Sequence, residues 1–128
     1  MIIKVKNKET LEIDLFKFRC AVGQKGFTNK KVEGDKKTPR GIFSIGKLYY
    51  RDDRISQFET KLKSIQIKKN MGWCDDINSK NYNQLIKIDK KNKYEKLYRR
   101  DHKYDLFIPI HYNTKPIIKN KGSAIFIH

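Results

Sequence analysis

Cysteine, proline and glycine are all scarce: the 128 residues include two cysteines, three prolines and seven glycines. Two cysteines are too few for a disulfide scaffold, and neither lies in a pattern with the spacing of a zinc site. The sequence leaves open a single disulfide between Cys20 and Cys74, which would require an oxidising compartment. No apolar run approaches the roughly 18 residues of a membrane-spanning helix, and the first residues show no signal-peptide pattern.

Acidic residues are also scarce, with 14 Asp and Glu against 30 Lys and Arg and a net charge of +16. One interpretation is a polyanionic partner, such as nucleic acid, anionic lipid or an acidic wall polymer. The other is an AT-rich genome, because the codons of the abundant Lys, Asn and Ile consist almost entirely of A and T. We favour the second, since arginine, which best suits phosphate and guanine, is the minority cation. Both predict nonspecific retention on polyanions at low salt, and no motif predicts a specific nucleic-acid partner.

The remaining composition predicts one folded domain. Hydrophobic residues make up 38% and aromatic residues 12% of the chain, which is too much for a disordered tail. A chain of this length can bury one modest core without disulfides. We therefore expect a single domain over residues 1–128.

Alternation of apolar and polar residues predicts a mainly β fold, sandwich or barrel-like, with long loops. The phase of this alternation slips by one residue at Leu15-Phe16, which suggests a β-bulge there. The expected strands are 2–6, 11–15, 16–22, 42–45, 48–50, 65–67, 86–88, 104–112 and 124–127. Helical signal is limited to Asn92, which could cap one short turn.

Two of these strands carry a more specific expectation. Pro109 removes a donor from the strand 104–112, so that strand should lie at a sheet edge or be bulged at the proline. The segment 124–127 is apolar on both faces, which predicts a buried central strand.

The first candidate motif lies in a long loop and reads Glu-Gly-Asp-Lys-Lys-Thr-Pro-Arg-Gly over 33–41. Glycines at both ends can adopt positive φ, and the Thr-Pro step favours an extended chain. Arg40 could meet a carboxylate of a ligand, although a structural loop with solvated charges explains the same residues. The residues that define the motif are Gly34, Asp35, Thr38, Pro39 and Gly41.

The second motif lies in what should be another irregular loop, 72–83. Its residues are Gly72, Trp73, Cys74, Asp75, Asp76, Tyr82 and Asn83. The paired carboxylates could serve a metal or acid–base chemistry, but an Asp-capped turn beside a packed Trp is the favoured reading. A nucleophilic cysteine here would need one of the three histidines (102, 111 or 128) as a base close in space.

The third motif is Gly-Ser-Ala-Ile-Phe-Ile-His over 122–128. A histidine at the end of a buried strand is well placed to act as a general base, because the strand fixes its position. A frayed and solvated terminal residue is the plainer explanation of His128 by itself.

In this order, the three motifs resemble the L,D-transpeptidase (YkuD-type) catalytic domain over roughly residues 15–128. The most similar branch contains small stand-alone members with a Gly-Trp-Cys-Asp-Asp segment. The resemblance implies a β-sandwich-like catalytic domain that acts on peptidoglycan stem peptides in the cell envelope. A cysteine thiolate attacks the stem peptide, D-alanine leaves, and the acyl group passes to an amine or to water. The resemblance implies no metal and no organic cofactor.

The resemblance also implies individual roles. His128 matches the catalytic histidine, Arg40 and Ser123 are candidate substrate-binding residues, and the other motif residues are structural. The family's nucleophile lies in a Gly-Cys segment that follows the histidine, and neither Cys20 nor Cys74 matches it. We therefore expect a C-terminally incomplete catalytic domain that is inactive by itself. The alternative is a non-catalytic relative that binds wall glycopeptide or another polyanion through its basic surface.

Overall fold

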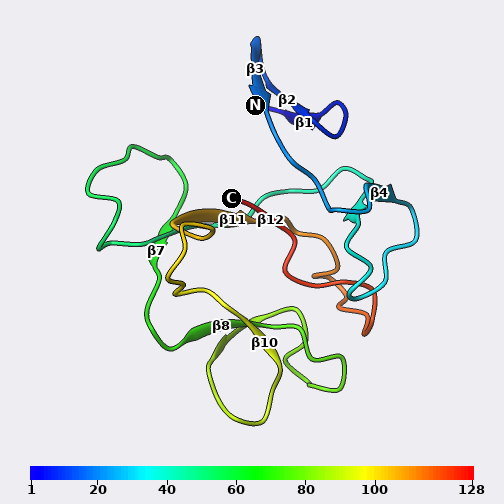
Figure 1. Cartoon of the computed structure of the whole chain (residues 1–128), viewed down its shortest axis with the longest axis vertical. Coiled ribbons are helices and arrows are strands. Elements are labelled where there is room, and N and C mark those ends of the chain that lie inside the picture. The colour runs from blue at the N-terminus through cyan, green and yellow to red at the C-terminus, as the bar shows by residue number, and fades with distance from the viewer. The chain divides into compact units, whose positions relative to one another are not determined.

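The computed structural model describes all residues 1–128, and every regular element in it is a β-strand (Figure 1). The mainly β prediction is therefore confirmed, and the helical turn expected at Asn92 does not form. No helix in the structure is long and apolar enough to cross a membrane. The chain divides into two compact units, Met1–Gly41 and Ile42–His128. The single-domain organisation stays a prediction.

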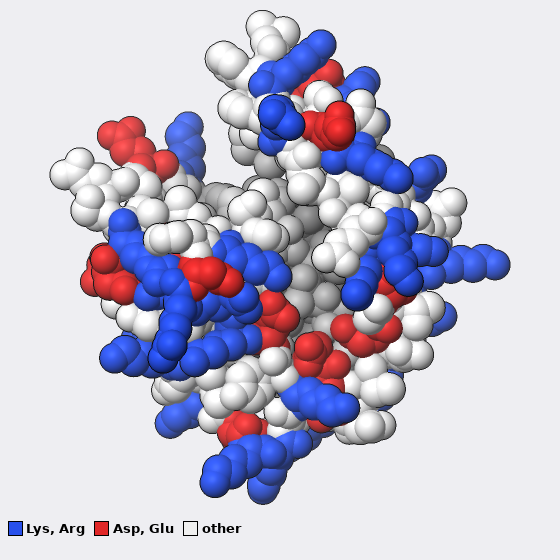
Figure 2. All heavy atoms as spheres, in the orientation of Figure 1, with Lys and Arg blue, Asp and Glu red and all other residues white.

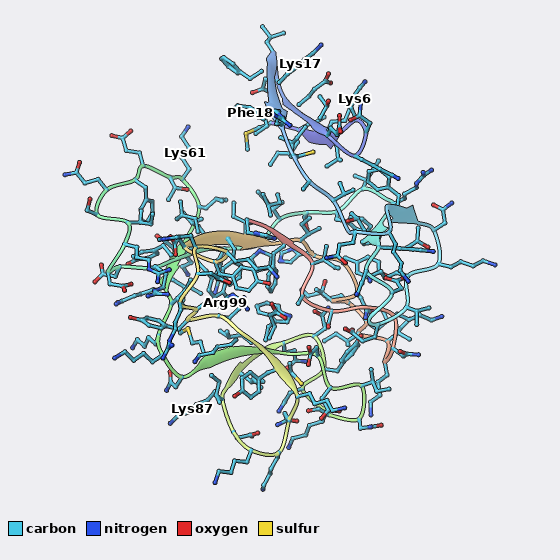
Figure 3. The ribbon with its side chains drawn as sticks, viewed as in Figure 1. Lys6, Lys17, Phe18, Lys61, Lys87 and Arg99 are labelled. Atoms are coloured by element: carbon cyan, nitrogen blue, oxygen red, sulfur yellow. The ribbon has the colours of Figure 1, made fainter.

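The first unit begins with an antiparallel sheet of order β1-β2-β3. Its strands are β1 (Ile3–Val5), β2 (Thr10–Ile13) and β3 (Phe16–Arg19). The register places the apolar residues of all three strands on one face, because side chains alternate along each strand. Lys17 and Phe18, both labelled in Figure 3, are consecutive in β3 and therefore belong to opposite faces.

The bulge expected at Leu15-Phe16 is wrong, because the phase slip marks a hairpin turn. Ile13 pairs directly with Phe16, so only Asp14 and Leu15 connect β2 to β3. Asp14 has φ of 52°, a left-handed conformation that Asp tolerates better than most residues. Leu15 is 97% exposed, as expected for a turn residue.

The remainder of the first unit is the long glycine-containing loop, closed by one short parallel pair. Strand β4 (Phe27–Thr28) pairs with β5 (Thr38–Pro39), with Phe27 opposite Thr38. The Thr-Pro step of the first motif therefore lies in a strand and is anchored by backbone hydrogen bonds.

The second unit contains a four-stranded sheet of order β12-β11-β6-β7. Its strands are β6 (Leu48–Tyr50), β7 (Ser64–Gln66), β11 (Leu106–Pro109) and β12 (Phe126–Ile127). The pair β6·β7 is parallel, and the other pairs are antiparallel. The expected strand 42–45 does not form, apart from a bridge between Ile45 and Ile110.

A three-stranded antiparallel sheet of order β10-β8-β9 forms the second layer of this unit (Figure 1). Its strands are β8 (Met71–Cys74), β9 (Leu85–Lys87) and β10 (Tyr94–Lys96). Gly72, Trp73 and Cys74 therefore lie in the central strand of a sheet, and the irregular loop expected from residue 72 begins only after Cys74. The Met-Gly-Trp-Cys run has no polar–apolar alternation, because successive residues from Gly72 to Cys74 are all buried.

Aromatic side chains fill the space between the two sheets of this unit. Tyr49 and Phe107 face each other across β6 and β11 and stack with ring centroids 4.7 Å apart. Trp73 reaches this pair from the opposite sheet, with its ring 6.4 Å from that of Tyr49 and 5.1 Å from that of Phe126. Such edge-to-face contacts contribute about 1 kcal/mol each beyond the burial of apolar area.

Pro109 is the last residue of β11, an interior strand, so the edge position considered for it is wrong. The alternative, a bulge at the proline, is confirmed: the pairing shifts by one residue between the pair of Phe107 with Tyr49 and the pair of Ile110 with Ile45, where the carbonyl of Pro109 accepts a hydrogen bond from Gly46 N at 2.7 Å. Strand β12 lies at one end of the four-stranded sheet and is only partly buried, although a central position was expected. Its apolar residues are explained by contacts of Phe126 with the aromatic core rather than by strands on both sides.

Candidate active site

His128 directly follows β12, and its ring lies against the ring of Tyr104. The ring centroids are 5.4 Å apart and the ring planes form an angle of 84°, an edge-to-face arrangement. Strand β12 is fixed to its neighbour by the pairing of Ile127 with Ile108. His128 as a whole is exposed, although its ring is partly buried.

The environment of His128 keeps its imidazole neutral at physiological pH. Partial burial of the ring and then the positive charge of Lys103 lower the pKa of His128 below its usual range. A hydrogen bond with the backbone of Lys103 and the charge of Glu95 act in the opposite direction but are weaker. A neutral imidazole can accept a proton, which is what a general base requires.

Tyr104 is itself held in place by Glu95 of β10. Its hydroxyl donates a hydrogen bond to Glu95 Oε1 at 2.8 Å, and the residue is 4% exposed. Glu95 also forms an ion pair with Lys103 Nζ at 3.5 Å. Burial raises the pKa of Tyr104 far above its usual value, so the hydroxyl stays a donor. The ring of Tyr104 is therefore held in one position against His128.

Two arginines, Arg51 and Arg54, fix the segment 99–105 that contains this tyrosine. Arg51, only 3% exposed, donates to the first carbonyl of the segment at 2.7 Å. Arg54 donates to the next two carbonyls at 2.8 and 2.6 Å. Asp53 neutralises Arg51 through two hydrogen bonds of 2.7 and 2.8 Å, and Asp105 accepts one from Arg54 at 2.8 Å. This support could not be predicted from the sequence, whose only local signal for it is Arg-Asp-Asp-Arg over 51–54.

The side chain of Asn83 joins four segments of the second unit. Its Oδ1 accepts hydrogen bonds from Trp73 Nε1 at 2.9 Å and from the amide of Ala124 at 3.1 Å. Its Nδ2 donates to the carbonyls of Tyr112 at 3.1 Å and Asn113 at 2.8 Å. All four hydrogen bonds of the amide are therefore made, and the residue is 6% exposed.

Tyr82, next to Asn83 in sequence, also holds the segment 122–124, which leads to His128. Its hydroxyl accepts a hydrogen bond from the amide of Gly122 at 3.0 Å, and the residue is 1% exposed. Ser123, a candidate substrate-binding residue, lies between the two attached residues and is 8% exposed. The Tyr-Asn pair of the second motif thus positions the third motif.

Cys74 is completely buried in β8 and has no exposed surface, so it is not accessible as a nucleophile. Cys20 and Cys74 are both free thiols in the structure, and the disulfide left open by the sequence stays a prediction. The other two histidines bond elsewhere: His102 Nδ1 lies 2.6 Å from Asp105 Oδ2, and His111 Nδ1 lies 2.8 Å from Ser44 Oγ.

Asp76 organises the turn after β8. Its two carboxylate oxygens accept hydrogen bonds from the amides of Asn78 at 3.0 Å and Lys93 at 3.2 Å. These bonds lower the pKa of Asp76, which agrees with the Asp-capped turn favoured by the sequence. Asp75, beside it, donates its own amide to the carbonyl of Lys93 at 3.3 Å. No group of three or more His, Cys, Asp or Glu side chains is arranged to hold a metal ion.

The first motif forms a compact loop around Asp35 in the first unit. This carboxylate accepts hydrogen bonds from Lys31 Nζ, from the amide of Val32 at 3.0 Å and from the amide of Lys37 at 2.9 Å. Burial alone would raise the pKa of Asp35, but these bonds outweigh it and lower the pKa to about 2. The structural loop considered in the sequence analysis is what forms here.

The Thr-Pro step is attached to the start of the same loop. Thr38 Oγ1 accepts a hydrogen bond from the amide of Gly23 at 2.8 Å. Gly34 and Gly41 have φ of 77° and 150°, as expected for glycines at both ends of the motif. Arg40 is exposed, with its guanidinium carbon 5.4 Å from the centroid of the Phe27 ring.

Within the second unit, the structure brings together the second motif, the third motif and His128. The first motif, with Arg40, belongs to the other unit. The functional residues that sequence reasoning missed are Glu95, Tyr104, Arg51 and Arg54. They escape detection because their partners are up to 51 residues away in sequence.

The second unit is all-β, and His128 follows a strand beside its aromatic core. These features agree with one family of catalytic domains. The L,D-transpeptidase catalytic-domain (YkuD) family matches residues 2–128, nearly the whole chain. The chain therefore belongs to this family, whose members act on peptidoglycan peptides, and the resemblance seen in the motifs is confirmed. No curated protein and no solved structure matches the chain.

Proposed function

We propose that the protein takes part in L,D-transpeptidase-type acyl transfer on peptidoglycan stem peptides, with His128 as the proton-transfer residue. The observation that carries this proposal is the placement of His128. Its imidazole is partly buried, is held at the end of β12 against Tyr104, and has a lowered pKa. The family match adds the substrate class.

In the proposed reaction, a cysteine thiol transfers its proton to His128, and the thiolate attacks the amide carbonyl between the diamino acid and the terminal D-alanine. A C–S bond forms and the C–N bond breaks. The D-alanine nitrogen takes the proton from the imidazolium and leaves as the amine. An amine of a second stem, or water, then gives a proton to the neutral His128 and attacks the thioester; the new C–N or C–O bond forms, the C–S bond breaks, and the thiolate is released.

The thiol in this proposal comes from a Gly-Cys segment after His128, which residues 1–128 do not include. The buried position of Cys74 supports this choice, because a side chain without exposed surface cannot reach a substrate. We further propose that Arg40 pairs with a carboxylate of the stem peptide and that Ser123 helps orient the substrate.

The proposal is tested by incubating the protein, as its gene encodes it, with tetrapeptide-stem muropeptides and measuring released D-alanine. We expect release by the wild type and a loss of at least about 100-fold in His128→Gln, as for removal of a general base. His102→Gln is the matched control, because this exposed histidine bonds only Asp105. Absence of release by the wild type, or equal rates in both variants, would contradict the proposal.

The second candidate function is a non-catalytic binder of wall glycopeptide or another polyanion. It is favoured by the net charge of +16 and by Lys and Arg side chains that are spread over the visible face in Figure 2. This function predicts retention on sacculi that weakens with salt and survives both Cys20→Ala and Cys74→Ala. Equal retention on neutral beads at moderate salt would exclude it.

A further inference from the structure

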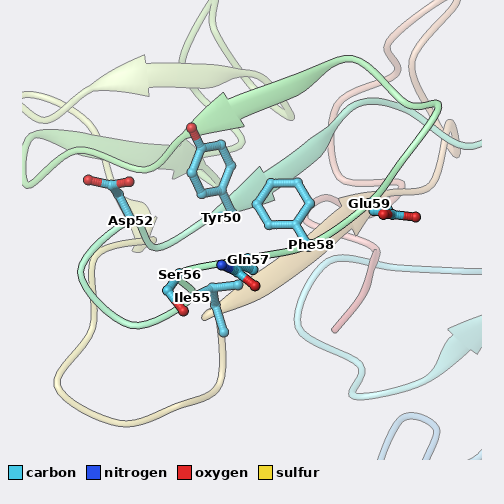
Figure 4. Close-up of a pocket in the computed structure, with 7 residues that line it drawn as sticks. All are labelled: Tyr50, Asp52, Ile55, Ser56, Gln57, Phe58 and Glu59. Atoms are coloured by element: carbon cyan, nitrogen blue, oxygen red, sulfur yellow. The ribbon is translucent and has the colours of Figure 1, made fainter.

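A pocket of about 590 Å³ lies beside the end of β6, under the loop that follows this strand (Figure 4). It is distinct from the surroundings of His128, with which it shares no residue. The lining residues are Tyr50, Asp52, Ile55, Ser56, Gln57, Phe58 and Glu59.

Two aromatic rings form the apolar part of this pocket. The rings of Tyr50 and Phe58 contact each other with centroids 4.9 Å apart and planes at 60°. Phe58 is 37% exposed, so part of its ring remains open to a ligand. Ile55 adds a third apolar side chain to the lining. This surface suits the methylene groups of an aliphatic chain.

Two carboxylates flank these rings. Asp52 and Glu59 lie on opposite sides of the ring pair in Figure 4 and are both exposed. Neither of them belongs to any ion pair of the structure. No Lys or Arg lines the pocket, although the chain contains 30 of them. The pocket is therefore a locally acidic site in a strongly basic protein.

We propose that this pocket binds an aliphatic ligand with ammonium groups, such as a diamine or a peptide with a primary-amine side chain. The carboxylates attract the ammonium groups, and the faces of the rings attract cations and contact the methylene groups. Anionic and neutral ligands lack this attraction. The inference does not depend on the acyl-transfer reaction, because it needs neither His128 nor a thiol.

The test is an NMR titration of the protein with pentane-1,5-diamine, which carries two ammonium groups at pH 7. We expect saturable shifts of the amide signals of residues 50–59, with a dissociation constant in the millimolar range. Asp52→Asn and Glu59→Gln should each weaken binding about threefold, the size typical of exposed charge pairs. Phe58→Ala should also weaken it, and 0.5 M salt should reduce the affinity.

The controls distinguish binding by the pocket carboxylates from binding caused by the net charge of the protein or by apolar contact alone. Asp14→Asn makes the same charge change in the turn between β2 and β3, outside the pocket lining, and should leave binding unchanged. Pentane-1,5-diol has the same chain without charge and should not shift these signals. The proposal is overturned if Asp52→Asn and Glu59→Gln behave like Asp14→Asn, if the diol binds equally well, or if only magnesium ions shift these amides.

Discussion

The imidazole of His128 lies edge-on to the phenol ring of Tyr104, with centroids 5.4 Å apart and planes at 84°. Tyr104 also contacts Phe107 and Phe126, so the histidine is connected through one ring to the aromatic core. The orientation of the proposed proton-transfer residue is thus supported by the packing that stabilises the two sheets.

Substitution of Tyr104 should separate its packing from its hydrogen bond. Tyr104→Phe keeps the ring and loses the bond to Glu95, which should lower the free energy of unfolding by about 1 kcal/mol. Tyr104→Ala leaves a cavity in the core and should cost about 4 kcal/mol. Urea unfolding measures both. Similar losses of unfolding free energy in the two variants would contradict the packing of the Tyr104 ring in the core.

The pKa of His128 should lie below the usual value of about 6.5. The unfolded chain binds a proton more readily, so stability from this group is complete above pH ~6.5 and decreases as the pH falls through the folded-state pKa. Lys103→Gln should raise the pKa of His128, because it removes the nearby positive charge. NMR titration of the imidazole signals measures this, with Lys115→Gln, an exposed lysine, as the matched control. A lower pKa in Lys103→Gln would contradict this account.

Asn83→Ala should be among the most destabilising single substitutions in the second unit. It removes four hydrogen bonds and leaves the indole N–H of Trp73 without its acceptor. We expect a loss of about 3 kcal/mol or more, because unpaired buried polar groups keep their desolvation cost. Asn92→Ala, whose amide bonds only the exposed Asp89, should cost less than about 1 kcal/mol. Equal effects would show that Asn83 does not join the segments as described.

Gly23→Ala and Gly34→Ala should differ in the first unit. A Cβ at Gly23 would lie 2.6 Å from the carbonyl oxygen of Lys36, a backbone atom that cannot move aside alone. A Cβ at Gly34 meets nothing within 4 Å, and only its φ of 77° opposes substitution, at about 1 kcal/mol. Hydrogen exchange of the loop amides should therefore be accelerated far more in Gly23→Ala. The reverse order would contradict the close approach at Gly23.

The fold could be predicted where polar and apolar residues alternate along a strand. Residues 106–109 alternate within a longer alternating run, so β11 was expected, and the hairpin at Asp14-Leu15 left a visible phase slip. Strand β8 could not be predicted, because Gly72, Trp73 and Cys74 are all buried and show no polar–apolar alternation.

The candidate site was predictable only in part, and for a related reason. His128 and the Tyr82-Asn83 pair stand in recognisable motifs, although nothing local indicates that one attaches the other. The hydrogen bond from Asn83 to Ala124 spans 41 residues, and that from Arg51 to the carbonyl of Arg99 spans 48. Such contacts are determined by the packing of the sheets and leave no periodicity in the sequence.

The most direct test of the central claim is intact-protein mass spectrometry of the gene-encoded protein mixed with a tetrapeptide stem. The account predicts a covalent adduct with the mass of the stem minus D-alanine, sensitive to hydroxylamine as a thioester, and absent from residues 1–128 alone. An adduct on Cys74, or no adduct with the gene-encoded protein while D-alanine is still released, would contradict it.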